Sequence, residues 1–542
     1  MSEFARVPVD PLDGPTFALG GRVVTMNDKK QVLDDGVVYV SGGSIVAVQK
    51  ADKAAPDGFD GVKVLETKGT IYPGLIDLHD HLSYNAIQLW DVPKRFTNRD
   101  QWAQGDTYRQ LVTGPMKALA STPKYVPAVV RYVECKCLVG GTTTTQGMTL
   151  SSFAGIQHFY KGIVRNVEQT DEPELPNAGT HIADVAAKDH EKFLKRLESF
   201  DCLLLHLSEG TDDAAREHFL ALQAPSGEWA VTGSLAGIHC VALQKQDFEV
   251  LAEREASMVW SPLSNLLLYG ETADVAAARE AGVLMALGPD WSPSGSKNLL
   301  GELKIARLVS GLDGDDLSDF ELLSMATRNA AKILSWDKQV GSLESGKRAD
   351  LLVVAGDGGD GHAHLFTRSE HDVELVVVNG VPRYGASQVM QRLLGEAAAE
   401  AEEGSVAGRA RLFYLVQPSG DAVVGGLTLA EATDLLADGL KRLPELAKAL
   451  EKGLKLDPDA LLLVLDHDEP DGIDQRPHLP DRNGNFTAML HPAERAATPL
   501  SKLLIPLTLD PLTVPDDARF VDVLAKEANL PKEVAAHVTD LF

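Results

Sequence analysis

The sequence predicts an α/β fold, because the pattern of apolar residues in a long central region differs from the pattern in the segments on either side of it. Between about residue 70 and residue 335, compact apolar runs such as TIYPGLIDL, CLLLHLSEG and GVLMALGPD alternate with segments of helical period. Such alternation is typical of parallel strands joined by crossover helices. On both sides of this region, short apolar stretches are instead separated by turn residues, which indicates antiparallel strands.

The two flanking segments are expected to form one β module together. The first contains RVVTM, GVVYV and SIVAV, and the second contains GSLESGKRADLLVV and VELVVVNGVPRYG. We therefore expect residues 1–70 and 336–385 to be the two halves of a composite β-sandwich, and residues 71–335 to be the catalytic domain between them.

Residues 386–542 form a third region, which we expect to be an extra and mostly helical appendage. It begins with an Ala/Glu-rich segment at 387–402, for which we expect a helix, and continues with a strand at RARLFYLVQ. A long helix should then begin at the capping box from Thr428 to Glu431. Leu and Ala recur at near-helical spacing beyond this box, so the region should pack against the catalytic domain or a partner subunit.

The composition describes a folded protein with an acidic surface. Of 542 residues, 44% are hydrophobic and 24% are charged, which excludes disordered and fibrous classes. The 78 acidic and 51 basic residues give a formal net charge of -27, which would repel nucleic acid and anionic lipid. Four cysteines are too few for a disulfide scaffold, and no segment resembles a signal peptide or a membrane span. We therefore expect a cytoplasmic protein with no nucleic-acid or membrane partner.

Polar residues with metal-binding side chains follow several of the predicted strands. The run LIDLHDH places His79 and His81 two residues apart, so that both imidazoles point to the same side. His206 ends the run CLLLH, His239 ends GIH, and Asp290 follows VLMALG. Because parallel strands in a barrel open on one face at their carboxyl ends, these four segments should converge there on one site.

These motifs together resemble those of the amidohydrolase superfamily, in the branch with one metal ion that includes cytosine, guanine and adenosine-type deaminases and triazine chlorohydrolases. The resemblance rests on PGLIDLHDH, GGTTTT, HLSE, IH, LGPD and the closing GSLESGKRADLLVV, which together span residues 17 to about 385. It implies that the catalytic domain is a (β/α)8 barrel of the TIM type.

The resemblance also implies a role for each of the strand-end residues. His79, His81, His206 and Asp290 would bind one divalent metal ion, with zinc as the first choice and Fe(II) as the alternative. The open position on such an ion lowers the pKa of bound water to about 7 and yields hydroxide. Glu209, three residues beyond His206, would be the proton shuttle, His239 would hydrogen-bond the hydroxide or the oxyanion, and Asp290 would accept the water's proton.

The implied function is hydrolysis of a carbon–nitrogen bond in a small nitrogen-containing compound, such as a heterocycle or a cyclic amide, by a deaminase or amidohydrolase. A hydrolytic dehalogenase or a carbamate or urea hydrolase would use the same site and remains the alternative. A non-catalytic scaffold is the alternative from another class, and the intact set of site residues argues against it. We expect a small-molecule substrate and a homo-oligomer.

Glu168 leaves the number of metal ions open. It lies at the end of GIVRNVE, where binuclear relatives carry a bridging Glu or carboxylated Lys. The alternative is that Glu168 pairs with Arg165 or another nearby base, and because HLSE matches the mononuclear pattern we favour one metal ion.

Asn265 and Trp90 are candidate substrate-binding residues. Asn265 belongs to the segment SPLSN, which resembles a turn after the seventh strand, and it could hydrogen-bond a polar substrate or fix its loop. Trp90, with Tyr84, Trp102 and Trp291, is expected in or near loops of the catalytic face. These aromatic side chains could form a wall of the substrate pocket or pack their own loops.

Overall fold

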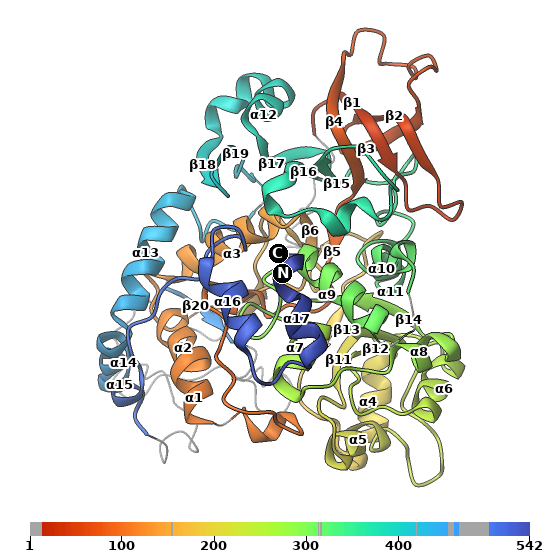
Figure 1. The fold of residues 1–542 in the computed structure, drawn as a ribbon. Helices are drawn as coiled ribbons and strands as arrows, with labels where there is room; N and C mark the ends of the chain where they lie inside the picture. Colours follow the sequence, from red (N-terminus) through yellow and green to blue (C-terminus); the bar gives the residue numbers. More distant parts are fainter. Residues whose placement is uncertain are drawn as a thin grey trace, which may run out of the picture.

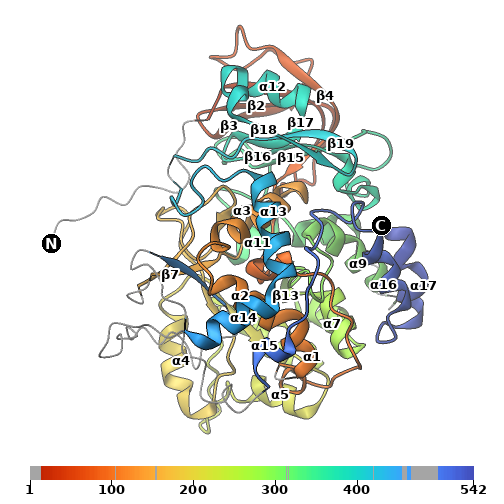
Figure 2. The same ribbon diagram turned by 90° about the vertical axis from the view of Figure 1, so that its left-hand side faces the viewer.

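The computed structural model describes residues 14–542 with the exception of residues 104, 153–155, 313, 315–316, 419, 454–459 and 466–497. A large sheet forms a layer at one end of the molecule, and the α/β body lies beneath it (Figures 1 and 2). This sheet combines strands from both flanks of the chain, in the order β18-β19-β17-β16-β15-β4-β1-β2-β3. The strands are β1 (Phe17–Val24), β2 (Val32–Ser41), β3 (Ser44–Lys50), β4 (Val64–Pro73), β15 (Leu351–Ala355), β16 (Val373–Val378), β17 (Val381–Ala386), β18 (Glu402–Val406) and β19 (Arg409–Phe413).

The two flanking segments meet where β4 pairs with β15. The pairing is antiparallel, with Leu351 opposite Pro73 and Ala355 opposite Gly69. Both strands are apolar and buried along this contact, so each flank supplies side chains that the other covers. The pairing continues beyond residue 385, because β17 is joined to β19 and β19 to β18.

The body of the protein contains parallel strands in two arcs. One arc has three strands and the other five, and within each arc every pairing is parallel. Backbone hydrogen bonds link the arcs at both edges, from Ala178 N to Val167 O at 2.8 Å and from Leu78 N to Leu287 O at 3.5 Å. The strands are β5 (Leu75–Ile76), β6 (Thr142–Thr145) and β9 (Arg165–Asn166) in the first arc, and β10 (Gly179–His181), β11 (Leu203–Leu207), β12 (Leu235–His239), β13 (Ser257–Trp260) and β14 (Leu284–Leu287) in the second.

Helices alternate with these strands along the chain, as the α/β prediction requires. Their inward faces are apolar, and the strands they cover are buried along their whole length. The helices of the body are α1 (Asp106–Tyr108), α2 (Gly114–Ala120), α3 (Val126–Val139), α4 (His190–Leu197), α5 (Asp213–Leu220), α6 (Lys245–Glu253), α7 (Pro262–Tyr269), α8 (Val275–Ala281), α9 (Leu299–Leu312), α10 (Asp319–Met325) and α11 (Arg328–Ile333).

The region after residue 386 contains both helices and strands. At the start of α13 the capping box between Thr428 and Glu431 is present, which confirms that prediction. Strand β20 pairs with β7 of the body, which in turn pairs with β8. The remaining elements are β7 (Thr149–Ser152), β8 (Gln157–Phe159), α12 (Ser387–Leu394), α13 (Leu429–Lys441), α14 (Leu443–Lys452), β20 (Leu461–Val464), α15 (Leu500–Leu503), α16 (Ala518–Lys526) and α17 (Lys532–Leu541).

The last part of the chain is held against the body by buried polar contacts. The carboxylate of Asp510 is fully buried and forms ion pairs with the ammonium groups of Lys136 and Lys297. Asn529 donates a hydrogen bond to Leu267 O at 3.0 Å, and Lys304 donates one to Leu541 O at 2.8 Å. In Figure 1, α16 and α17 accordingly lie across the body near α7 and α9.

All four cysteines are free and buried, as expected for thiols that play no part in a disulfide scaffold. In the part of the chain that the structure describes, we find no helix that is both long enough and apolar enough to cross a bilayer.

Candidate metal centre

The structure brings together the five strand-end residues that the sequence singles out. His79 and His81 follow β5, His206 lies in β11, His239 ends β12, and Asp290 lies just beyond β14. Each is at most 5% exposed. The parallel strands therefore deliver four imidazoles and one carboxylate to the same end of the body.

The nitrogen and oxygen atoms of this group face one another at short range. His79 Nε2 lies 3.0 Å and His81 Nε2 lies 3.4 Å from Asp290 Oδ1, and His81 Nε2 lies 3.2 Å from His206 Nε2. Two overlapping triads have ligand atoms within 4.8 Å of one another: His79, His81 and Asp290 form one, and His79, His206 and His239 form the other. Such sets of imidazole nitrogens with a carboxylate oxygen are the ligands that zinc takes in proteins.

Unsatisfied ring nitrogens inside the group also fit a bound cation. His79 Nε2 and His206 Nδ1 are buried and have no partner in hydrogen-bond geometry among the described residues, although Asp290 Oδ1 lies 3.0 Å from His79 Nε2. On the other side of its ring, His79 Nδ1 lies 3.3 Å from Gln146 Oε1, an oxygen that can only accept, so the ring proton belongs on Nδ1. The lone pair of His79 Nε2 is then available to a metal ion.

Burial and mutual charge set the protonation of the group. Burial lowers the pKa of His79 to about 4, and burial together with the neighbouring imidazoles lowers the pKa of His206 well below its ordinary value. Burial alone would raise the pKa of Asp290, but the imidazoles of His79, His239 and His81 hold it below its usual range. At neutral pH His79 and His206 are therefore neutral and Asp290 is ionised, the forms that bind metal ions.

Two of the site residues have a left-handed backbone that is unusual outside glycine. His239 has φ of 68° and Asp290 has φ of 72°. Such conformations cost on the order of 1–3 kcal/mol and persist where surrounding structure fixes them. Asp290 is fixed through backbone hydrogen bonds from Asp290 N to His79 O and from His81 N to Asp290 O.

Ser264 and Asn265, at the start of α7, hold the orientation of two site residues. Ser264 Oγ donates a hydrogen bond of 2.6 Å to Asp290 Oδ2, which leaves Oδ1 directed at the imidazoles. Asn265 Oδ1 lies 2.9 Å from His239 Nδ1, and Asn265 Nδ2 donates to Thr272 Oγ1 at 3.1 Å. The segment expected to be a turn is thus the first turn of a helix, and both faces of the Asn265 amide are engaged within the protein.

Glu209 lies beside this group and has its own positioning contacts. Its Oε1 accepts a hydrogen bond of 2.7 Å from Tyr269 OH, and Tyr269 OH in turn accepts one of 2.9 Å from Trp102 Nε1. Its Oε2 lies 3.8 Å from both His239 Nε2 and Arg99 Nη1. Burial raises the pKa of Tyr269 well above its ordinary value, so this hydroxyl stays a donor.

Glu168 lies outside both donor triads and has other partners. It accepts hydrogen bonds from Gly147 N at 2.8 Å and from Thr180 Oγ1 at 2.9 Å. Thr180 Oγ1 also accepts from Gln146 Nε2 at 3.1 Å, which joins Glu168 to His79 through two intervening side chains. The guanidinium of Arg165 binds the carboxylate of Asp350.

The aromatic side chains predicted near the catalytic face form a buried group next to His81. The ring centroids of Trp291 and His81 are 5.2 Å apart, and those of Trp291 and Tyr84 are also 5.2 Å apart. Trp90 lies 5.4 Å from Tyr108, whose ring is 6.1 Å from Trp291. One side of the candidate metal centre is therefore lined with aromatic rings.

Several residues of the site carry no signal in the sequence. Tyr269, Arg99 and Gln146 reach the site from a helix, a short turn and the residue after a strand, and none lies in a motif that points to chemistry. Ser264 lies inside the SPLSN segment, so that motif could have indicated it beside Asn265.

The fold and the buried donor group define a metal-dependent hydrolase on an α/β scaffold. Residues 70–383 match the model of the amidohydrolase family, and the chain belongs to that family. It is accordingly an enzyme of the amidohydrolase type, acting on carbon–nitrogen bonds other than peptide bonds.

Comparison with known proteins identifies relatives and structural neighbours. A 5-methylthioadenosine/S-adenosylhomocysteine deaminase of Thermoanaerobacter pseudethanolicus is 24% identical over 398 residues, which cover 66% of this chain and 91% of the relative. An adenosine deaminase from Xanthomonas campestris with bound zinc aligns with a TM-score of 0.57 at 20% identity, covering 80% of this chain and 99% of that one. An atrazine chlorohydrolase from Arthrobacter aurescens in complex with zinc aligns with a TM-score of 0.53 at 22% identity, covering 68% and 94%.

Proposed function

We propose that this chain is a deaminase that removes an amino group from a small aromatic heterocycle at one divalent metal ion, with zinc as the first choice. The convergence of His79, His81, His206 and Asp290 is the observation that carries the proposal. We take these four residues as the ligands, since Glu168 is engaged by Thr180 and a backbone amide outside the donor triads.

The residues around the proposed ion have separate roles in proton transfer and in stabilising charge. When bound, a divalent ion supplies a Lewis acid that activates water for attack near neutral pH. Asp290 and Glu209 are the carboxylates that can take up a proton, and Glu209, held by Tyr269, passes it to the departing nitrogen. His239 faces Glu209 through Nε2 and can stabilise the negative charge on the oxygen that water adds to the ring carbon.

The aromatic group next to His81 supports a flat substrate. Trp291, Tyr84 and Tyr108 present ring faces and edges that stack well on a planar heterocycle. Trp90 packs behind them, and we propose that it shapes this wall rather than hydrogen-bonding the substrate. The deaminase relative acts, by its name, on 5-methylthioadenosine and S-adenosylhomocysteine, so we propose an aminopurine or a compound of similar shape as the substrate class.

We also propose that Asn265 positions His239 instead of binding the substrate. Its carbonyl oxygen is 2.9 Å from His239 Nδ1 and its amide nitrogen is bonded to Thr272, which uses both ends of the side chain. This arrangement assigns the ring proton of His239 to Nδ1 and directs Nε2 toward the reacting groups.

The test combines metal analysis with a substrate panel. The purified enzyme should contain about one zinc per chain, and chelation should remove activity that added zinc restores. It should release ammonia from adenosine, 5-methylthioadenosine, S-adenosylhomocysteine or guanine. Chloride release from a chlorinated triazine without ammonia release from any aminopurine would favour the dehalogenase alternative. A purified protein without stoichiometric metal would contradict the proposal and support a non-catalytic scaffold.

For the organisation of the chain, we propose that residues 71–335 form a (β/α)8 barrel and that strands β1–β4 and β15–β17 of the large sheet are the composite module of residues 1–70 and 336–385. The β4–β15 pairing supports the composite module, and the hydrogen bonds between the two arcs support the barrel. Because β18 and β19 extend the sheet, we propose that the region after 386 contributes to this module as well as packing its helices on the barrel.

A further inference from the structure

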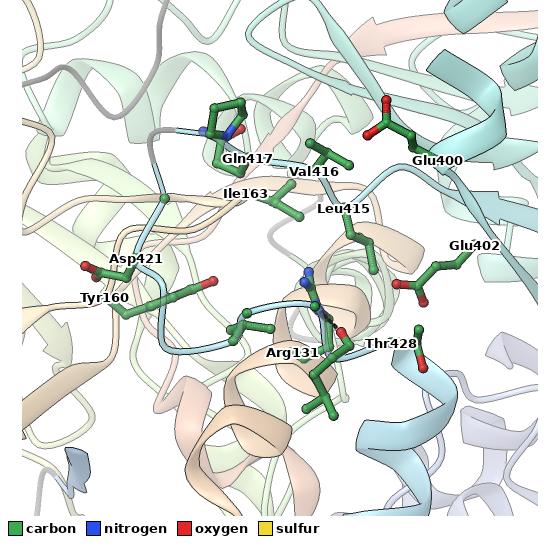
Figure 3. Close-up of a pocket in the computed structure, with 16 residues that line it drawn as sticks. Arg131, Tyr160, Ile163, Glu400, Glu402, Leu415, Val416, Gln417, Asp421 and Thr428 are labelled. Atoms are coloured by element: carbon green, nitrogen blue, oxygen red, sulfur yellow. Dashed lines mark hydrogen bonds between the residues drawn. The ribbon is translucent and has the colours of Figure 1, made fainter. Parts of the chain in front are cut away.

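A cavity outside the metal centre lies where the chain after β19 crosses α3. It encloses about 470 Å³, within the range of about 300–1,000 Å³ that small-molecule sites occupy. Its walls come from α3, from the loop after β8, from Glu400 and Glu402, and from residues 415–418, 420–421 and 424–428 (Figure 3). None of the strand-end residues of the metal centre lines it.

The most unusual feature of this cavity is the guanidinium group of Arg131. This residue of α3 is 6% exposed, and its Nε donates a hydrogen bond of 3.0 Å to Leu427 O. Among the residues that the structure describes, we find no hydrogen-bond or ion-pair partner for its two terminal nitrogens. In Figure 3 these nitrogens point into the cavity. The buried carboxylate of Glu134, one turn along α3, interacts electrostatically with Arg131 but forms no ion pair with it within 4.0 Å. A ligand carboxylate that binds both terminal nitrogens would therefore supply the direct partner that no described residue provides.

Carboxylates of the protein line another part of the same cavity. Glu402 lies on β18, and its Oε2 accepts a hydrogen bond of 2.7 Å from Leu429 N. Glu400 and Asp421 also line the cavity. Glu402 makes no ion pair within 4.0 Å of Arg131 in the described structure, although both side chains face the same space in Figure 3. The cavity therefore holds one buried positive group and several negative groups that do not neutralise it directly.

This separation of charge selects one kind of ligand. A simple anion would gain from Arg131 but would be repelled by the carboxylates, and a simple cation would be repelled by Arg131. A molecule with a carboxylate at one end and an ammonium group at the other can pair with Arg131 through the first and with the protein's carboxylates through the second. The remaining wall, with Ile163, Leu415 and Val416, is apolar and suits a hydrocarbon side chain.

We propose that this cavity is an accessory binding site for a small zwitterion of the amino-acid type. The ligand's carboxylate binds the terminal nitrogens of Arg131, and its ammonium group lies toward Glu402. The site is independent of the proposed deaminase reaction, because it shares no residue with the metal centre.

The first experiment measures binding to the full-length, metal-loaded enzyme by isothermal titration calorimetry. The probes are the twenty standard amino acids, and L-leucine is compared with isopentylamine and 4-methylpentanoate, which each keep one of its two charged groups. We expect saturable binding of at least one amino acid and, for leucine, binding at least about tenfold tighter than for either analogue. If no amino acid binds at millimolar concentration, or if either analogue binds as tightly as leucine, the proposal is wrong.

Variants then locate the site. Arg131→Met removes the partner of the ligand carboxylate, and Glu402→Gln removes a charge but keeps an oxygen that can accept from Leu429 N. Both should weaken amino-acid binding at least about tenfold while metal content stays unchanged. Glu403→Gln, at the neighbouring exposed position of β18, is the matched control and should bind normally. Binding that survives either test substitution overturns the proposal, and if Arg131→Met does not fold, Glu402→Gln decides alone.

Discussion

Replacing Glu209 by Gln should separate metal binding from chemistry. The substitution keeps the size of the side chain and an oxygen that can accept the 2.7 Å hydrogen bond from Tyr269 OH. It removes the negative charge and with it the ability to carry a proton. The four proposed ligands are unchanged, so the metal content should remain at the wild-type level.

The size of the effect follows from the role of Glu209 in moving the proton. General acid–base catalysis contributes roughly 10²–10⁴-fold, so kcat should fall by that factor, which corresponds to about 2.7–5.4 kcal/mol of barrier. Tyr269→Phe leaves the carboxylate in place and removes one hydrogen bond to it. We therefore expect a smaller loss, of about tenfold, in that variant.

The assay is steady-state turnover of an identified aminopurine, measured as ammonia release, with metal content determined on the same preparations. A Glu209→Gln enzyme that retains near-normal kcat would refute the proton path through Glu209. If the variant lost its metal ion, Glu209 would be a ligand, and a site with two metal ions that involves Glu168 would need to be considered again.

Three further predictions concern the metal ligands, the C-terminal contact and a buried carboxyl group. His206→Ala should lose both metal and turnover, whereas His218→Ala, on α5, should lose neither; full metal content in the first variant would mean that the ligand set is different. Asp510→Asn should lower the free energy of unfolding by about 3–5 kcal/mol, because buried Lys136 loses the carboxylate that it pairs with and Lys297 keeps only its ion pair with Asp517. The exposed Asp522→Asn should change it by less than about 0.5 kcal/mol, and equal thermal melting of the two variants would contradict this reasoning. Burial raises the pKa of Glu302 from 4.5 to about 8, so the folded protein retains a proton that the unfolded chain releases. The stability that this group contributes is complete below about pH 4.5 and is lost as the pH rises through about 8. Melting temperatures of Glu302→Gln relative to wild type should therefore rise between about pH 5 and pH 9, and parallel curves would show that Glu302 does not titrate in this range.

The sequence predicts those parts of the site that lie next to a strand. His79, His81, His206, His239 and Asp290 each follow or end an apolar run, and the common direction of parallel strands brings them together without knowledge of the loops. The family follows from the same motifs and is confirmed by the match to the amidohydrolase family model.

The supporting contacts could not be predicted in this way, because they depend on the paths of loops. Tyr269 reaches Glu209 from the far end of a helix, and Arg99 approaches it from a turn more than a hundred residues earlier. The sequence near either residue carries no information about such long-range contacts. The same holds for Asp510, whose burial is explained only by lysines on α3 and in the loop before α9.

The large sheet shows that strand propensity alone does not predict every strand. The apolar runs of β15 and β16 predict strands by themselves, whereas EEGSV in β18 lacks the alternating apolar pattern of a strand. Its conformation depends on pairing with β19, which lies beside β17. Tertiary pairing here overrides a weak local preference.

The Asp510 contact has a consequence for how the protein is made. Lys297 and Asp510 are separated by 213 residues, a distance that a ribosome covers in roughly 10–40 seconds at about 5–20 residues per second. For most of that interval the catalytic domain has been synthesised with two lysines whose burial requires a carboxylate that has not yet been made. The domain can form its strands early, but the final closure around Lys136 and Lys297 must follow synthesis of the tail. Maturation of this enzyme is therefore expected to be a post-translational event, and nascent chains stalled before residue 510 should be more sensitive to proteases than the finished protein.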